Sequence, residues 1–158
     1  MKKILFIFSI PLLNACTLGF EPEGGNWSLV GDEGDVIDTC GFGDSDSDSD
    51  SDEDTQLVLD PTEDGFLLRF DIESPEDASS CTLDGKDFTC ESLSRTEDSD
   101  DTVFTIELNV YGSFDNATEG FINMSYQYSC EGDYCSVILP EENPCEISIS
   151  TSFQHADL

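Results

Sequence analysis

Residues 102–130, TVFTIELNVYGSFDNATEGFINMSYQYSC, decide the fold class of this 158-residue chain. In both halves of the stretch, apolar residues recur at every second position, which is the period of a β-strand with one buried face. A polar connector over 112–119 separates the halves. We therefore expect two long strands, over 102–111 and 120–130, that pair at the centre of a sheet. Their inward-facing residues would be Phe104, Ile106, Leu108 and Val110, then Ile122, Met124, Tyr126 and Tyr128.

Shorter alternating segments on both sides of this stretch indicate further strands. Residues 56–60 and 66–72 form one expected hairpin around 61–65, and 80–83 and 88–90 form another around 84–87. Other strands are expected over 26–30, 36–40, 136–139 and 145–153, whereas the polar segment 94–101 is expected to be a loop. With about eight to ten short strands and no helical period, the domain is predicted to be all-β, either an antiparallel barrel or a sandwich.

The amino-terminal residues 1–15 have the features of an export signal. Lys2 and Lys3 precede an apolar run over 4–13, and a small residue, Ala15, stands directly before Cys16. The apolar run is too short for a transmembrane helix, which needs roughly 20 residues. We therefore expect a signal peptide that is removed from the mature protein.

The tetrapeptide Leu13-Asn14-Ala15-Cys16 resembles the lipobox of bacterial lipoproteins. The resemblance implies cleavage before Cys16, a thioether-linked diacylglycerol on its sulfur, and an acyl chain such as palmitate on its new amino group. Several chains on one residue anchor a protein stably in a membrane. In this family Thr17, in place of Asp, after the cysteine favours the outer membrane, with its periplasmic and surface faces both left open. The expected organisation is a lipidated cysteine and tether over 16–25 and a single β domain over 26–158.

Seven cysteines are an odd number for an exported chain. If Cys16 is acylated, six remain, and these allow three disulfides in an oxidising compartment. One pair lies across a four-residue hairpin loop, a second brackets a tight turn, and the two cysteines left over join the first and last parts of the domain. A crossed pattern among the last three cysteines is the main alternative, and a zinc site at the tight turn is less expected than a disulfide. The expected bridges are Cys81–Cys90, Cys130–Cys135 and Cys40–Cys145.

The formal net charge of −31 sets limits on the partners of this protein. It excludes nucleic acid, whose phosphates such a surface repels, and favours divalent cations or basic partners. Once the leader is removed, Arg69, Lys86 and Arg95 are the only basic residues against 36 acidic ones.

The most acidic segment, 43–55, is expected to be a disordered loop, because its carboxylates repel one another and it has no apolar group to bury. It begins like an EF-hand calcium loop but lacks glycine at position six and glutamate at position twelve. We therefore expect no dedicated metal site, only weak attraction of cations to the alternating carboxylates Asp44, Asp46, Asp48, Asp50, Asp52 and Asp54.

Catalytic motifs are not apparent in the sequence. It contains neither a Gly-x-Ser-x-Gly nucleophile elbow nor a glycine-rich phosphate loop. The single histidine, His155, lies three residues from the carboxyl end and is expected to be an exposed tail residue. We therefore predict a protein that is not an enzyme and that has no cofactor.

Three hypotheses for the function remain. The first is a lipid-anchored envelope lipoprotein whose non-catalytic β domain binds a partner or has a structural role. The second is a carrier of a small apolar ligand, because Gly25-Asn26-Trp27 resembles the Gly-x-Trp that opens the first strand of lipocalin-like barrels, and because 66–70 and 126–128 form aromatic strand faces. The inward residues could equally fill the interior, with Trp27 as a core anchor. The third is a surface protein that binds divalent cations weakly.

Overall fold

The computed structural model describes residues 19–42, 56–70, 78–99, 101–133, 135–139 and 143–156. The fold is all-β, as predicted, with one short helix in the described residues. The elements are β1 (Gly25–Asp38), β2 (Gln56–Pro61), β3 (Gly65–Arg69), β4 (Ala78–Asp84), β5 (Asp87–Cys90), β6 (Leu93–Ser99), β7 (Thr102–Asn116), β8 (Glu119–Gly132), α1 (Cys135–Ile138) and β9 (Cys145–His155).

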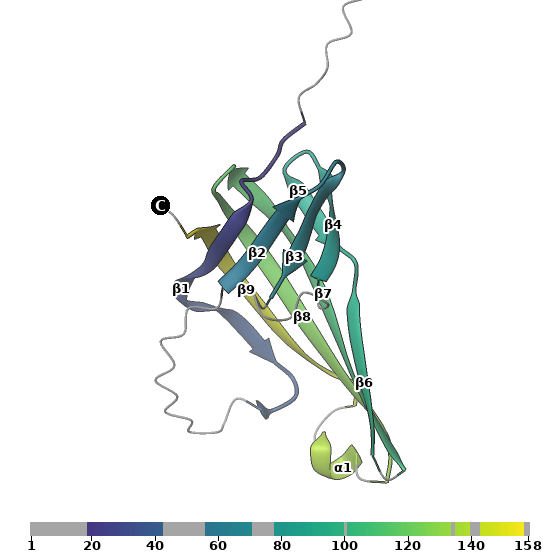
Figure 1. Cartoon of the computed structure of the whole chain (residues 1–158). Coiled ribbons are helices and arrows are strands. Elements are labelled where there is room, and N and C mark those ends of the chain that lie inside the picture. Colours follow the sequence, from purple (N-terminus) through teal and green to yellow (C-terminus); the bar gives the residue numbers. More distant parts are fainter. Residues whose placement is uncertain are drawn as a thin grey trace, which may run out of the picture.

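The strands form a closed antiparallel barrel, which decides between the barrel and the sandwich. The order of neighbours is β5-β4-β3-β2-β1-β9-β8-β7-β6, and an additional pairing of β5 with β7 closes a ring of eight strands (Figure 1). Strand β6 lies outside the ring and pairs with β7. Because β1 pairs with β9, the first and last strands of the described chain are neighbours in the wall.

The two long strands expected over 102–111 and 120–130 are β7 and β8, with 15 and 14 residues. They pair from Thr102 opposite Gly132 to Asn116 opposite Glu119, so the hairpin is longer at both ends than the sequence indicated. Strand β9 flanks β8 on its other side. Val110, Ile122 and Met124, which the alternation of apolar residues places on the inward face of this hairpin, are buried in the core.

Two expected segments adopt a different structure. Within the segment 94–101, which was expected to be a loop, residues 94–99 belong to β6. The edge of β7 supplies backbone partners from Leu108 to Thr102 to this polar segment, which has no apolar period of its own. Residues 136–139, expected to be a strand, lie largely in α1, where the Leu139 N–H donates to the Cys135 carbonyl at 2.8 Å. The expected strands over 26–30 and 36–40 are joined in β1, whose register against β9 shifts between Val30 and Asp35.

One end of the barrel is filled by aromatic side chains, and we call it the closed end. Trp27, whose side chain is fully buried, packs edge-on against Phe114 and at a tilt against Phe153, with ring centroids 5.8 and 4.9 Å away. Phe88 lies over Gly112 of β7, where a Cβ atom would approach the Phe88 Cζ to 2.6 Å. Glycine is therefore required at this position, so that the aromatic ring can pack against the strand. Trp27 is a core anchor, one of the two roles considered for it.

The segment before β1 also belongs to the closed end. The Phe20 ring packs against Phe114 at 5.3 Å, and the Glu23 N–H donates to the Ala117 carbonyl at 2.8 Å. The Trp27 indole N–H donates to the Glu23 carbonyl at 3.0 Å. Residues 20–24, which the sequence assigned to the tether, thus lie against the barrel.

Three disulfides link the described cysteines, and they are the pairs favoured by the sequence: Cys40–Cys145, Cys81–Cys90 and Cys130–Cys135. Cys81 and Cys90 are direct cross-strand partners of β4 and β5. Cys40–Cys145 spans 105 residues of sequence and fixes the end of β1 to the start of β9, whereas Cys81–Cys90 spans nine.

The two disulfides should differ in their contribution to stability because they close loops of different length. Replacing both Cys40 and Cys145 by alanine should lower the free energy of unfolding by about 4.7 kcal/mol, and replacing both Cys81 and Cys90 by roughly 3 kcal/mol or less. Urea unfolding of the two double variants and the unmodified protein measures the difference. Equal losses would contradict the loop-length explanation.

Candidate ligand-binding site

The barrel wall is complete only over part of its length. Strands β2 to β5 have between four and seven residues, whereas β7, β8 and β9 have 15, 14 and 11. Strand β5 pairs with β7 around Tyr111, and farther along β7 its place is taken by β6, which has no second neighbour in the described residues. Figure 1 shows β6 to β9 continuing well beyond the short strands toward α1. Among the described residues, the short strands therefore cover the inner face of the long strands only in part.

A hollow of about 430 Å³ lies on this inner face, and we call it the inner hollow. Cross-strand partners point to the same side of a sheet. Leu93 of β6, Leu108 of β7 and Tyr126 of β8 are successive partners, and Arg95 is opposite Ile106 in the next row. The inner hollow is lined by apolar or aromatic residues and by two polar residues. The apolar or aromatic ones are Phe70, Leu93, Ile106, Leu108 and Tyr126, and the polar ones are Ser94 and Arg95.

The inner hollow continues the core toward the open side of the barrel. Leu108 and Tyr126 follow the buried Val110 and Met124 on the same strand faces. Phe70 directly follows β3, whose Phe66 and Leu68 are both 1 % exposed and belong to the aromatic core. The same alternating pattern thus fills the barrel at one end and lines a hollow farther along.

The two tyrosines of this face stay protonated at ordinary pH. Burial raises the pKa of Tyr126 above its usual value of 10.0, and the neighbouring Tyr128 raises it further. Burial, followed by the charge of Asp38, raises the pKa of Tyr128 in the same direction. Each hydroxyl can therefore both donate and accept a hydrogen bond.

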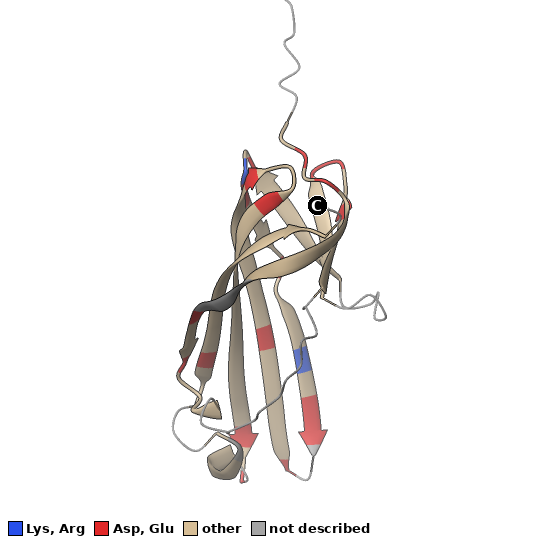
Figure 2. Ribbon diagram, turned by 90° about the vertical axis from the view of Figure 1, so that its left-hand side faces the viewer, with Lys and Arg blue, Asp and Glu red and all other residues tan. Residues whose placement is uncertain are grey.

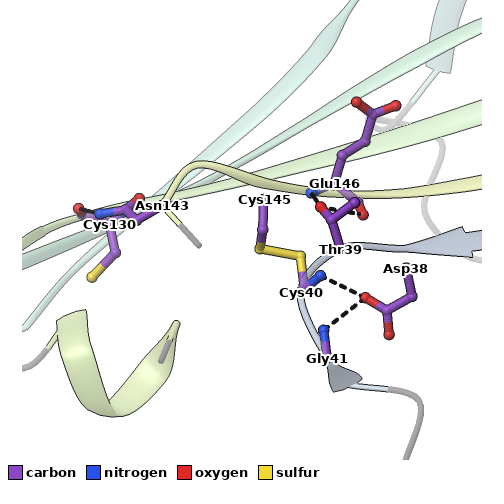
Figure 3. The surroundings of a disulfide bond; sticks show 8 residues. All are labelled: Asp38, Thr39, Cys40, Gly41, Cys130, Asn143, Cys145 and Glu146. Atoms are coloured by element: carbon purple, nitrogen blue, oxygen red, sulfur yellow. Dashed lines mark hydrogen bonds between the residues drawn. A yellow bond between two sulfur atoms is a disulfide. The ribbon is translucent and has the colours of Figure 1, made fainter. Parts of the chain in front are cut away.

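The end of the long strands near α1 is held by disulfides and hydrogen bonds. Figure 3 shows the Cys40–Cys145 disulfide, beside which the Asp38 carboxylate accepts from the N–H groups of Cys40 and Gly41 at 2.7 and 3.0 Å. Asn143 exchanges two hydrogen bonds with the backbone of Cys130, at 3.0 and 2.6 Å.

Aromatic side chains join this disulfide cluster to the inner face of the sheet. The buried cysteines of the two bridges and Leu139 pack with Phe104, Tyr128 and Ile147. The rings of Phe104 and Tyr128 are stacked with centroids 6.1 Å apart. The far end of the inner face is therefore covered by packed residues and does not depend on a ligand to be filled.

A second hollow, of about 520 Å³, lies at the closed end beside Phe20, and we call it the acidic hollow. Its lining includes Glu21, Glu63 and Asp64, together with Phe20 and Leu83. Within the described ranges, no group of three or more His, Cys, Asp or Glu residues could hold a metal ion. The predicted cation-attracting carboxylates Asp44, Asp46, Asp48, Asp50, Asp52 and Asp54, and the lipidation residue Cys16, lie outside the described residues.

The expectation that His155 is an exposed tail residue is wrong. Its side chain is 6 % exposed, and its ring lies edge-on to Trp27 at 5.7 Å. The Nε2 atom is 3.2 Å from the Gly24 carbonyl oxygen. The reason is that β9 continues to His155, which pairs with Trp27 to complete the barrel wall. His155 therefore belongs to the seam between the first and last strands.

The structure divides the predicted aromatic faces between core and hollow. Phe66 fills the closed end, whereas Phe70 and Tyr126 line the inner hollow. The sequence prediction did not single out Leu93 or Arg95, and Arg95 lies in the expected loop over 94–101. No apolar period could have indicated them, because Leu93 is the single apolar residue of β6 and the strand forms by pairing with β7.

Charged residues are distributed unevenly around these features. Figure 2 shows that long parts of the strands carry no charge, while acidic segments gather at loops and strand ends.

No helix among the described residues has the length and apolar character needed to cross a membrane.

The buried Tyr126 should make the stability of the protein depend on pH. Burial raises the pKa of Tyr126 in the folded state, so its contribution to stability is fully present below about pH 10. The contribution is lost as the pH rises toward the folded pKa. Tyr126→Phe should therefore lose less stability than the unmodified protein between about pH 9 and pH 11. Urea midpoints across this range provide the measurement. Tyr111→Phe, on the outer face of the same hairpin, is the control for loss of a phenol, and identical pH profiles for Tyr126→Phe and the unmodified protein would contradict the expectation.

Comparisons with family models, with curated proteins and with solved structures return no match for this chain. Its function is therefore argued from its own residues.

Proposed function

We propose that this protein is a lipid-anchored lipoprotein of the bacterial outer membrane whose β-barrel is a non-catalytic binding module for a small apolar ligand. The observation that supports binding is the inner hollow, where inward-facing side chains of β6, β7 and β8 line about 430 Å³ of open space instead of meeting in a core. This volume lies in the range of roughly 300–1,000 Å³ that is usual for small-molecule sites.

The composition of the inner hollow fits an apolar ligand with few polar groups. Five of its lining residues are apolar or aromatic, and each square ångström of apolar surface that a ligand removes from water contributes about 25 cal/mol. The aromatic core at the closed end, against which Phe70, Leu108 and Tyr126 pack, already stabilises the barrel, and three disulfides hold the chain. A ligand therefore enters a site that is largely preformed.

The anchor is supported by the leader sequence and by the cysteine pairing. The stretch Leu13-Asn14-Ala15-Cys16 carries the resemblance to a lipobox. Six of the seven cysteines are paired with one another in the described residues, so Cys16 is the cysteine left over for acylation. The disulfides also fit an oxidising compartment outside the cytoplasm.

The anchor is tested by the mass and the location of the protein in a bacterial host. Membrane-extracted protein should have the mass of residues 16–158 plus acyl groups, with six thiols that react with an alkylating reagent only after reduction. Cys16→Ser should remove the acylated form from the membrane fraction, because the acyl chains are its means of attachment. The variant should then be found as soluble protein or as protein whose leader is not cleaved. Cys81→Ser is the control and should keep the acyl mass. An unacylated mass for the unmodified protein would contradict the anchor.

Binding is tested with a fluorescent apolar dye and the full chain carrying Cys16→Ser, which avoids competition from acyl chains and detergent. The dye should bind to one site, and Leu108→Lys should weaken binding by at least about tenfold, because the ammonium group would occupy the apolar lining. Asn109→Lys is the matched control, since it adds the same charge at the next residue of β7, which points to the outer face.

A second variant separates loss of the site from loss of folding. Leu108→Trp fills the inner hollow without adding a charge and should also exclude the dye, while circular dichroism and the urea midpoint report whether the barrel is intact. Equal dye binding by Leu108→Lys, Leu108→Trp and the unmodified protein would contradict the proposed site.

A further inference from the structure

The charge of the inner hollow is opposite to the charge of the protein. The chain has 36 acidic and five basic residues, yet among the described residues that line the inner hollow the one charged side chain is a cation, Arg95. The acidic hollow shows the contrast, because its charged lining residues are Glu21, Glu63 and Asp64. Charge complementarity at the inner hollow therefore favours a ligand that carries a negative group.

Arg95 can exchange its present partner for a ligand. Its guanidinium lies 3.1 Å from the Glu97 carboxylate, and the two side chains are 78 % and 65 % exposed. Exposed ion pairs of this kind contribute little to stability. A ligand carboxylate can replace Glu97 at small cost and can accept two parallel hydrogen bonds from the guanidinium. Tyr126, whose side chain carries a neutral hydroxyl donor, lines the same hollow.

The apolar residues lie on the side of Arg95 that faces the core. In the β6–β7 register, Leu93 and Leu108 form the row between Arg95 and the closed end, and Phe70 follows the buried Leu68 of β3. The volume of about 430 Å³ is at the lower end of the range for small-molecule sites, which favours one apolar chain over two. The polar and apolar parts of the hollow thus match a molecule with a single head and a single tail.

We propose that the ligand is a single-chain amphiphile with a carboxylate head, which pairs with Arg95 while its apolar chain lies against Leu93, Leu108 and Phe70. The proposal rests on the proposed function and specifies its ligand class. A monoanionic head is favoured because the site offers one cation and because a dianionic head, such as a phosphate monoester, is repelled more strongly by the surrounding acidic residues.

The net charge predicts an unusual salt dependence for such a ligand. At low ionic strength the field of the acidic protein opposes the approach of an anion, and salt screens this repulsion. Raising the salt from about 20 mM to about 150 mM should therefore tighten binding of the carboxylate, since the Debye length falls to about 8 Å. A cationic amphiphile should show the opposite trend.

The experiment is displacement of the apolar dye from the Cys16→Ser chain by dodecanoate, dodecanol, dodecyl phosphate and dodecyltrimethylammonium, all below their micellar concentrations. Dodecanoate should displace the dye at about a tenfold lower concentration than dodecanol, as expected for a charged hydrogen bond that exchanges with water. Arg95→Gln should remove this preference. Lys86→Gln is the matched control, because it removes the same charge at the closed end, where Lys86 lies over Phe20 at 5.8 Å.

The outcomes distinguish a wrong ligand class from a wrong binding site. Equal displacement by dodecanoate and dodecanol, tighter binding of the phosphate or the ammonium compound, or an unchanged preference in Arg95→Gln would overturn the carboxylate assignment and leave the apolar site standing. If the dye itself does not bind, or binds equally to Leu108→Lys, the proposed function falls together with this inference.

Discussion

The register of β7 against β8 is the constraint on which the rest of this structure depends. Side chains alternate across a strand, so a slip of one residue would turn Glu107 and Asn109 inward and expose the apolar set. The same register places Val110 in the core and Leu108 beside the inner hollow. What differs along the hairpin is the opposite wall, which among the described residues is formed by β2 to β5 and does not extend as far as the long strands.

Much of the fold could be predicted from local patterns. The long hairpin, the all-β class and the bridge between Cys81 and Cys90 all follow from alternation and loop length within short stretches. The barrel closure could not be predicted this way, because it pairs strands that are distant in sequence. Strand β6 and α1 could not be predicted either, because their segments have no apolar period that indicates the observed structure. His155 illustrates the limit, since its burial is decided by pairing with Trp27 across the seam and not by its closeness to the chain end.

The candidate site was predictable only in part, for the same reason. Tyr126 and Phe70 belong to aromatic faces that the sequence shows directly. Whether such residues fill a barrel or line a hollow depends on the relative lengths of strands on opposite walls, which no single segment encodes. Arg95 gains its position only through the pairing of β6 with β7. Arg95, the charged residue on which the ligand proposal rests, therefore lies in a polar segment that has no apolar period of its own.

If Cys16 is acylated as proposed, the docking of Phe20 against Phe114 would keep the closed end near the bilayer. Two residues, Thr17 and Leu18, separate Cys16 from the first described residue, Gly19. An extended chain spans at most about 3.6 Å per residue, so an acylated Cys16 would hold the closed end within roughly 10 Å of the head groups. The inner hollow lies farther along β7, beyond its pairing with β5. A ligand would then be exchanged with the aqueous side or with an opposing surface, and the barrel would serve as a rigid spacer above the leaflet that anchors it.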